Sequence, residues 1–304
     1  MATMRTSPIL RLGMPNLMPG AWCVPTSRCG VDAWEEDVTM NRIKPVSRRM
    51  LSVEVMRKEW RTGNFLLVTV GGEDLKDFRP IGVDQAFRLL FRRPGQDRLW
   101  LPSRSDATWM AQYMMTGKAV RPYVRFYTVR HFWPDRNEMD IEFVLHEGDS
   151  PASTWARGAR PGEPVGILDE GATYSPPHGV EWQLLVGDET AVPAILSILD
   201  SDEGALPSEV FLEVPSSADI QQLNTPQNVI VHWLPRDGRP GLPGRYALDT
   251  VMKAALPAGR FATFVAGENH LPTTLRRHLV HERGVDKSDI TFVGYWRHGR
   301  ATPG

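Results

Sequence analysis

The stretch that decides the fold runs from Arg121 to Ala159 and reads RPYVRFYTVRHFWPDRNEMDIEFVLHEGDSPASTWARGA. In an extended segment, side chains two residues apart lie on one face, so Arg125 and Tyr127 share a face. A guanidinium can hold two phosphate oxygens, and a tyrosine ring offers a planar ligand a stacking surface. The pattern therefore predicts a strand that binds a ligand with a phosphate and a flat ring. The alternative is an ordinary strand with a packed Tyr127 and a solvated Arg125.

A second phosphate site is predicted further along the same stretch. Pro151, Ala152 and Ser153 follow Gly148 and open a predicted short helix. The free backbone amides at a helix N-terminus bind anions. One ligand can span both sites if it carries a diphosphate.

The chain around this stretch reads as short strands bounded by turns. The predicted strands are 51–58, 64–70, Gln85–Arg92, Tyr123–Arg130 and Met139–His146, with one short helix at Trp109–Met115. Helical periodicity is weak before residue 150. The pattern favours a closed antiparallel barrel, which leaves few exposed strand edges.

The pattern changes after a predicted hinge at residues 175–179. Buried strands are predicted at 182–188, 209–214, 228–234, 260–267 and 290–296, and helices at Glu189–Leu199, Ser216–Leu223, Ala247–Ala255 and Leu271–Arg283. Alternating strands and helices favour a parallel sheet covered on both faces. The predicted organisation is a tail over 1–48, a barrel over 49–177 and an α/β domain over 178–304.

Ligands of such sheets lie at the carboxyl ends of the strands, where two acidic loops are found. Gly187 to Thr190 takes the place of the first phosphate loop, but G-x-G-x-x-G is absent, and Asp188 and Glu189 would repel a pyrophosphate. The alternative is structural: Asp188 and Glu189 cap the start of a helix. Glu213 ends the next strand, where a carboxylate binds ribose hydroxyls and repels a 2′-phosphate. It favours NADH over NADPH, with a salt-bridged loop acid as the alternative.

Composition bounds the possible partners. The chain has 304 residues, 41% of them hydrophobic, a formal net charge of −1 and a pI near 6.7, which disfavour nucleic acid and anionic lipid. No apolar run is long enough for a membrane helix, and the expected location is cytoplasmic. Cys23 and Cys29 are too few for an iron–sulfur cluster and read as free thiols, with a local disulfide as the alternative. A monomer is expected.

No resident metal site is predicted. His278 and His281 are spaced i, i+3 on a predicted helix, but Arg276, Arg277 and Arg283 crowd the same stretch and disfavour a cation. The interpretation is a solvated basic helix.

Seven sequence blocks, taken in order, resemble the siderophore-interacting branch of the ferredoxin-reductase superfamily, the FAD-dependent ferric-siderophore reductases. The blocks are Arg125-x-Tyr127-Thr128, Glu138–His146, Pro151–Ala156, Gly187–Ala194, Glu213–Ser216, Ala266–Glu268 and Gly294–Arg297. The resemblance covers residues 49 to 300. Each block alone is weak, but their order is specific.

The resemblance implies an antiparallel Greek-key FAD-binding barrel followed by a Rossmann-like NAD(P)-binding domain. It implies that Arg125 meets the FAD phosphates, Tyr127 stacks on the flavin and Thr128 hydrogen-bonds near its reactive nitrogen. The other cofactor-binding residues that it implies are His146, Pro151, Ala152, Ser153, Gly187, Asp188, Thr190, Glu213, Gly267, Glu268 and Trp296.

The implied activity is electron transfer from NAD(P)H through FAD to a ferric siderophore, with release of Fe(II). No catalytic residue beyond the flavin is expected, and the expected substrate cations are Arg88, Arg130 and Arg297. The family often has Asp-Gln-His-Val-Lys-Leu where this chain has Asp84 to Leu89, so Arg88 keeps the charge but the histidine is missing. The alternatives are another flavin oxidoreductase, serving an oxygenase or free flavin, and a siderophore-binding flavoprotein without turnover.

Overall fold

The structure is a computed structural model that describes residues 42–145, 150–200 and 206–300. Cys23, Cys29 and His146 lie outside these residues, as does most of the predicted tail. The last part of that tail, from residue 42, contacts the barrel: Ile43 bridges Ala172, with its amide 2.8 Å from the Ala172 carbonyl.

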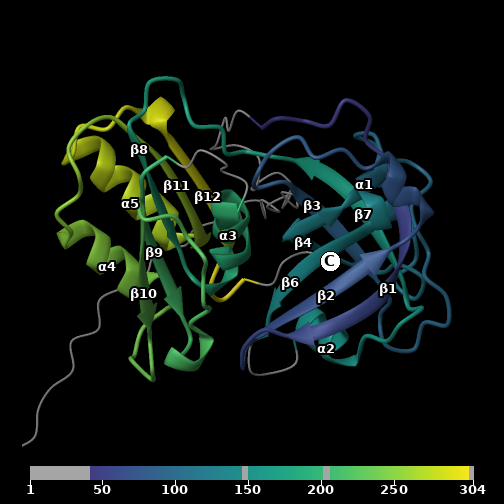
Figure 1. Cartoon of the computed structure of the whole chain (residues 1–304). Helices are drawn as coiled ribbons and strands as arrows, with labels where there is room; N and C mark the ends of the chain where they lie inside the picture. The colour runs from purple at the N-terminus through teal and green to yellow at the C-terminus, as the bar shows by residue number, and fades with distance from the viewer. Residues whose placement is uncertain (1–41, 146–149, 201–205, 301–304) are drawn as a thin grey trace, which may run out of the picture. The chain divides into compact units, whose positions relative to one another are not determined.

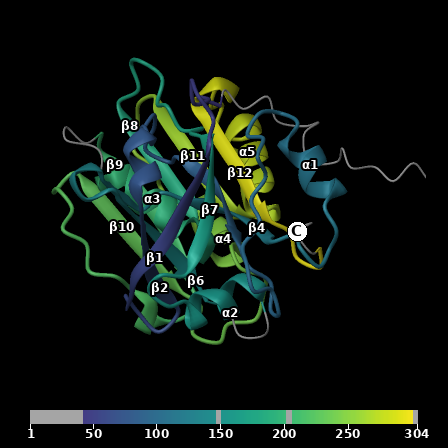
Figure 2. The ribbon, with the colours of Figure 1, turned by 90° about the vertical axis from the view of Figure 1, so that its right-hand side faces the viewer.

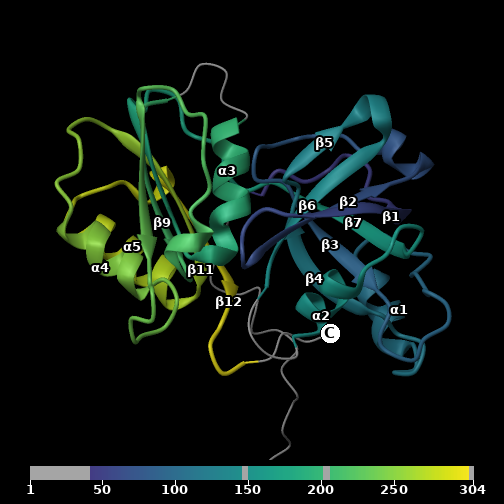
Figure 3. The ribbon, with the colours of Figure 1, turned by 60° about the horizontal axis from the view of Figure 1, so that its bottom comes forward.

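The first half of the described chain forms an antiparallel, barrel-like sheet (Figure 1). Its strands are β1 (Met50–Trp60), β2 (Phe65–Gly71), β3 (Ala86–Phe91), β4 (Tyr123–Thr128), β5 (His131–Trp133), β6 (Glu138–Val144) and β7 (Pro164–Gly171). They pair in the order β4-β3-β7-β1-β2-β6-β5, and β5 lies beside β6 (Figure 3). The antiparallel barrel predicted from the short strands is confirmed.

Apolar side chains from alternate strand positions fill the barrel. In β1, Leu51, Val53 and Val55 are buried while the residues between them are exposed, the period of two that a half-buried strand requires. Phe87 and Phe91 of β3 are fully buried in the same cluster. Burying an aromatic or aliphatic side chain of this size contributes roughly 1.5–3 kcal/mol.

Two short helices accompany the barrel. They are α1 (Trp109–Met115) and α2 (Pro151–Gly158). Trp109 and Tyr113 of α1 pack on the outer side of β3 and β4, against Leu90 and Val124. The helix α2 lies beside β2 and β6 (Figure 2) and buries Trp155 in the barrel core.

The second half of the chain forms a parallel sheet. Its strands are β8 (Trp182–Gly187), β9 (Ser208–Val214), β10 (Val229–Pro235), β11 (Phe261–Glu268) and β12 (Ile290–Trp296), in the order β10-β9-β8-β11-β12. Its helices are α3 (Val192–Asp200), α4 (Arg245–Lys253) and α5 (His270–His281), with α3 on one face and α4 and α5 on the other (Figure 1). Leu185 packs on the α3 side, whereas Leu184 and Val186 pack on the α4 and α5 side.

The remaining regular segments are short 3-10 turns. They span Glu73–Asp77, Pro134–Arg136, Glu189–Ala191, Ser217–Asp219 and Lys287–Asp289. The helix predicted over Ser216–Leu223 is wrong, because only the turn at Ser217–Asp219 forms there. The Asp219 carboxylate is buried and accepts hydrogen bonds from Thr62, Asn64 and Ser216. Side-chain bonds of this kind compete with a helix.

The described residues hold no helix long and apolar enough to cross a membrane.

The prediction that α5 is a solvated basic helix is corrected at one position. His278 is buried, with 8% of its surface exposed, and lies 3.1 Å from the Glu282 carboxylate.

Candidate functional site

Arg125 is a partly buried cation with no described carboxylate to neutralise it. It lies on β4, at one end of the strand order, and its Nη1 donates to the Val124 carbonyl at 2.7 Å. Burial lowers the pKa of Arg125, and the nearby positive charge of Arg93 lowers it further. A desolvated charge is stabilised by an anion, and a guanidinium suits phosphate oxygens. The environment of Arg125 therefore fits the phosphates of FAD.

Tyr127 and Thr128 continue the strand. The Tyr127 ring packs on Phe143 at 4.3 Å between centroids, with 45° between the ring planes. Burial raises the pKa of Tyr127, so its phenol is neutral at physiological pH. Burial raises the pKa of Tyr295, and the nearby Thr128 side chain opposes this rise, so the end of β4 lies close to β12.

The N-terminus of α2 is a candidate site for an anion. Its N-cap, Ser150, makes no side-chain capping bond, and Pro151 occupies the first turn. Ala152 and Ser153 are buried, with 7% and 2% of their surfaces exposed. The first amides of a helix lack intrahelical partners and favour phosphate. This arrangement fits a second phosphate contact, as the sequence predicts.

Asp188 ties together three loops at the carboxyl edge of the parallel sheet. Its carboxylate accepts hydrogen bonds from the amides of Thr190 at 2.9 Å and Glu268 at 2.6 Å, and from Trp296 Nε1 at 3.2 Å. Burial, with the neighbouring charge of Glu189, raises the pKa of Asp188 to about 7. The structure thus brings Asp188, Thr190, Glu268 and Trp296 together.

Two glycines allow this close packing. A Cβ atom on Gly187 would lie 2.6 Å from Ala191, and one on Gly267 would lie 2.6 Å from the Asp188 carboxyl. Gly267 also has a φ of 138°, which favours glycine. The Glu268 carboxylate accepts from the amides of His270 at 2.8 Å and His298 at 3.1 Å, so it too is engaged within the protein.

Glu213 has a different environment from the one predicted. It is fully buried, and its carboxylate accepts from the amides of Gly244 and Ala247 and from Arg236 Nη1, each at 2.9 Å. Arg236 also forms a bidentate pair with Glu189, at 2.7 and 2.8 Å. Both Glu213 oxygens are occupied, so this geometry corrects the prediction of a ribose contact and removes its basis for preferring NADH.

Arg88 belongs to a group of three arginines around one carboxylate. Arg42, Arg48 and Arg88 all pair with Glu170, whose side chain is 10% exposed. The Arg88 guanidinium also lies over the Phe126 ring at 4.2 Å. Three guanidiniums around the Glu170 carboxylate leave an excess of positive charge, even with the nearby Asp169, and this fits an anionic substrate.

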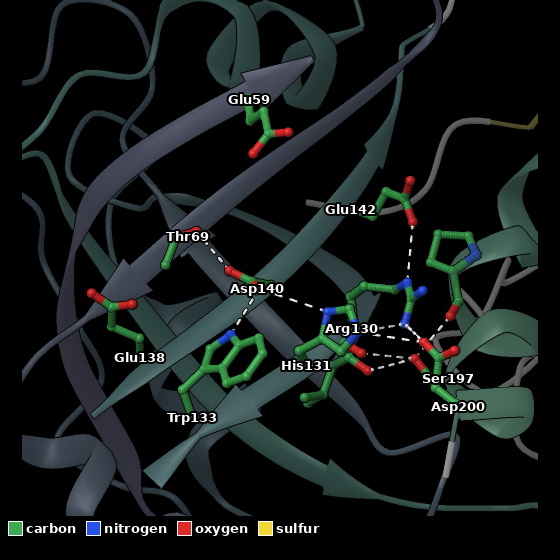
Figure 4. Close-up of polar contacts among 12 residues, drawn as sticks. Glu59, Thr69, Arg130, His131, Trp133, Glu138, Asp140, Glu142, Ser197 and Asp200 are labelled. Atoms are coloured by element: carbon green, nitrogen blue, oxygen red, sulfur yellow. Dashed lines mark hydrogen bonds and ion pairs between the residues drawn. The ribbon is translucent and has the colours of Figure 1, made fainter. Parts of the chain in front are cut away.

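The other two predicted substrate cations, Arg130 and Arg297, differ in exposure and in ion pairing. The Arg130 side chain is 9% exposed and pairs with Glu142 and Asp200 (Figure 4). This geometry corrects the prediction that Arg130 meets the substrate, because its charge is buried and already compensated. Arg297 is exposed, and no carboxylate in the described ranges forms an ion pair with it.

His131 lies between two carboxylates in the same cluster as Arg130. Its ring contacts Asp140 at 3.7 Å and Asp200 at 3.4 Å (Figure 4). Hydrogen bonds to Asp140 and Asp200 raise the pKa of His131. Burial works against ionisation of Asp140, but hydrogen bonds from His131, Thr69 and Trp133 outweigh it and lower the pKa of Asp140 to about 2.

Within residues 42–145, 150–200 and 206–300, no group of three or more His, Cys, Asp or Glu side chains is placed to hold a metal ion. Sequence reasoning did not single out Arg42, Arg48 or Arg93. Arg236 could not have been assigned to Glu189 and Glu213 from sequence, because the pairing depends on loops that only the folded sheet brings together.

Comparison with known proteins assigns the chain to a family. Residues 54–174 match the siderophore-interacting FAD-binding domain, and residues 180–299 match the siderophore-interacting protein family. Ferric vibriobactin reductase ViuB of Vibrio cholerae is 30% identical over 261 residues, which are 86% of this chain and 93% of that protein. The chain belongs to the siderophore-interacting protein family.

Two further proteins support membership of this family. Ferric acinetobactin reductase of Acinetobacter baumannii is 28% identical over 183 residues, covering 59% of this chain and 62% of that protein. The crystal structure of a siderophore utilization protein from T. fusca superposes with a TM-score of 0.75 and 29% identity, covering 86% of this chain and 98% of the other. The predicted family, two-part fold and FAD cofactor are confirmed.

Proposed function

We propose that this protein is an FAD-dependent ferric-siderophore reductase that passes electrons from NAD(P)H to an Fe(III)-siderophore. The relative from Vibrio cholerae is named for the reduction of ferric vibriobactin, and the barrel half of this chain matches an FAD-binding domain. The observation that carries the proposal is the uncompensated, partly buried guanidinium of Arg125 on a strand that also presents Tyr127 and Thr128.

These residues have separate tasks toward the cofactor. Arg125 and the amides of Ala152 and Ser153 hold the diphosphate, while Tyr127 and Thr128 position the ring system. FAD, when bound, accepts two electrons as a hydride and gives them up one at a time, which iron requires. The proposed domains are a tail over 1–48, an FAD barrel over 49–177 and an NAD(P)H-binding α/β domain over 178–304. The family matches at 54–174 and 180–299 support this division.

The pyridine nucleotide is proposed to bind at the carboxyl edge of the parallel sheet. Asp188 holds the loops that carry Gly187, Thr190, Gly267 and Glu268 in one arrangement. Its bond to the Trp296 indole places that ring at the same edge. The role of Asp188 is to orient the loops, because its oxygens already accept bonds from the protein.

Iron is proposed to arrive already wrapped in its chelator, as a small-molecule substrate of a cytoplasmic, monomeric enzyme. The described residues offer no cluster that would hold the bare ion. Recognition then rests on the charge of the chelator, for which Arg88 with its neighbours and the exposed Arg297 are the proposed contacts. Siderophore oxygens suit Fe(III), and Fe(II) is held more weakly after reduction and can be released.

The test is anaerobic turnover with FAD-loaded protein, NADH or NADPH, and a ferric siderophore in the presence of a colorimetric Fe(II) trap. We expect trapped Fe(II) that depends on the nucleotide and on the protein. The same siderophore loaded with Ga(III) is a matched control, because Ga(III) has the charge of Fe(III) but is not reduced. It should compete with the ferric complex without consuming nucleotide. Flavin reduction without Fe(II) release from any ferric chelate would refute the proposal.

A further inference from the structure

Two arginines beside Arg125 have no role in the function described so far. Arg93 follows β3, and Arg121 precedes β4. The two strands are antiparallel, with Phe91 opposite Tyr123, so continuing the register places Arg93 opposite Arg121. A hydrogen bond of 2.8 Å from Arg93 Nε to the Arg121 carbonyl fixes this pairing.

Arg93 and Arg125 lie against the same aromatic ring. Their guanidinium carbons are 4.2 Å and 5.6 Å from the centroid of the Tyr123 ring. Arg121 lies over the neighbouring Tyr113 ring at 5.1 Å. Tyr123 and Arg125 share one face of β4, whereas Tyr113 packs against Val124 on the other face. Two guanidinium groups thus lie against Tyr123, and a third lies over Tyr113.

This cluster lacks a negative charge. None of the three guanidiniums forms an ion pair with a carboxylate from the described part of the chain, and Arg121 Nε is buried without a hydrogen-bond partner. The charge of Arg93 works against that of Arg125, as the lowered pKa of Arg125 records. Collecting like charges away from water costs free energy unless an anion joins them. Arg92, next in sequence to Arg93, is paired instead, with Glu163 at 3.4 Å.

We propose that Arg93 and Arg125 together bind the diphosphate of FAD, and that Arg121 adds the third positive charge of this site. The inference rests on the proposed function, which assigns Arg125 to the FAD phosphates. A diphosphate carries two negative charges on adjacent groups, and each guanidinium can hold two oxygens of one phosphate. Such a site distinguishes FAD from FMN, which has a single phosphate.

The test measures FAD and FMN dissociation constants of the apoprotein by quenching of flavin fluorescence. We expect Arg93→Gln to raise the Kd for FAD by about tenfold and to raise that for FMN less. Arg93→Lys keeps the charge but not the two-pronged geometry, so its Kd should lie between those of wild type and Arg93→Gln. Arg92→Gln is the matched control and should leave both constants unchanged. Circular dichroism of each apoprotein checks that the variants fold.

The outcomes separate this inference from the proposed function. If Arg93→Gln binds FAD as tightly as wild type while turnover persists, the diphosphate site is wrong and the reductase stands. A variant with unchanged FAD affinity and a lower kcat/KM for an anionic ferric chelate would reassign the cluster to the substrate and also overturn the inference. A wild-type protein that binds no flavin would overturn both.

Discussion

Arg125 and Arg236 are partly buried arginines in the two halves of the chain, and their surroundings are opposite. Arg236 is paired with two carboxylates, those of Glu189 and Glu213, and these outweigh burial and raise its pKa. Arg125 has no described carboxylate partner, and burial lowers its pKa. Carboxylates of the protein neutralise Arg236, whereas no described carboxylate neutralises Arg125.

We propose that this difference separates residues that stabilise the fold from residues that bind a ligand. Glu213 accepts two amides at the start of α4, so the Arg236 network holds the loop edge of the parallel sheet in shape. The barrel leaves the Arg125 cluster cationic, a cost that a resident anionic cofactor removes. Substitutions on the two sides should therefore act on different quantities.

The largest effect is expected for Arg236→Met. It leaves Glu189 and Glu213, which are 1% and 0% exposed, buried without their counter-charge. Breaking a buried ion pair costs about 3–5 kcal/mol, so the free energy of unfolding should fall by that amount. Urea denaturation measures the change. Arg239→Met, which removes an exposed cation stacked on Tyr246, is the control and should cost less than ~1 kcal/mol. Equal losses of unfolding free energy in the two variants would contradict a structural role for the Arg236 ion pairs.

Arg125→Gln should act on the cofactor and spare the fold. We expect the FAD dissociation constant to rise by at least about tenfold, because a charge-assisted contact is lost. The apoprotein should keep its free energy of unfolding or gain slightly, because a desolvated charge beside Arg93 is removed. Flavin titration and urea denaturation of the same preparation test both points. A destabilised apoprotein with normal FAD affinity would mean that Arg125 is structural.

A smaller effect is expected for the substrate cations. Arg88→Gln or Arg297→Gln should lower kcat/KM for an anionic ferric siderophore several-fold and leave flavin reduction by NADH unchanged. Salt screens such charges over about 8 Å at physiological ionic strength, so the wild-type rate should fall as salt rises. The control is Arg277→Gln, an exposed cation of α5. Identical rates for all variants at every salt concentration would remove Arg88 and Arg297 from the substrate site.

The smallest effect concerns His131 and pH. The pKa of His131 is raised in the folded state, so its contribution to stability is present below its unfolded pKa and is lost as pH rises through the folded value. Asp140, with its pKa lowered to about 2, contributes above its unfolded pKa and loses this contribution only as pH falls toward 2. His131→Gln should flatten the stability profile above pH 6, measured by thermal unfolding, while the exposed His178→Gln should not. An unchanged slope in His131→Gln would contradict the assignment.

The sequence predicted the fold well where local patterns decide it. Apolar runs located β2, β8 and β11, and the block from Arg125 to Thr128 located β4. It did not predict β7, whose two glycines and acidic end interrupt the apolar pattern, or β5, which has only three residues. The helix expected after Glu213 fails because Asp219 uses its carboxylate to hold the turn between β1 and β2.

Site residues followed the same division. The cofactor roles proposed for Arg125, Thr128 and Ser153 depend on neighbours within one strand or one helix turn, which a sequence motif can capture. Glu213 and Arg130 depend on partners far away in sequence, Arg236 and Asp200, and only the folded chain shows that their charges are already satisfied. A sequence motif therefore does not show whether a charged side chain is already paired within the protein.

We propose that the uncompensated cations of the barrel hold FAD for electron transfer, and a visible absorption spectrum tests this most directly. The protein should purify yellow, or become yellow on reconstitution, with about one FAD per chain. Anaerobic addition of NADH or NADPH should bleach the flavin band, and a ferric siderophore should restore it. A colourless protein that gains no flavin on reconstitution would contradict the account.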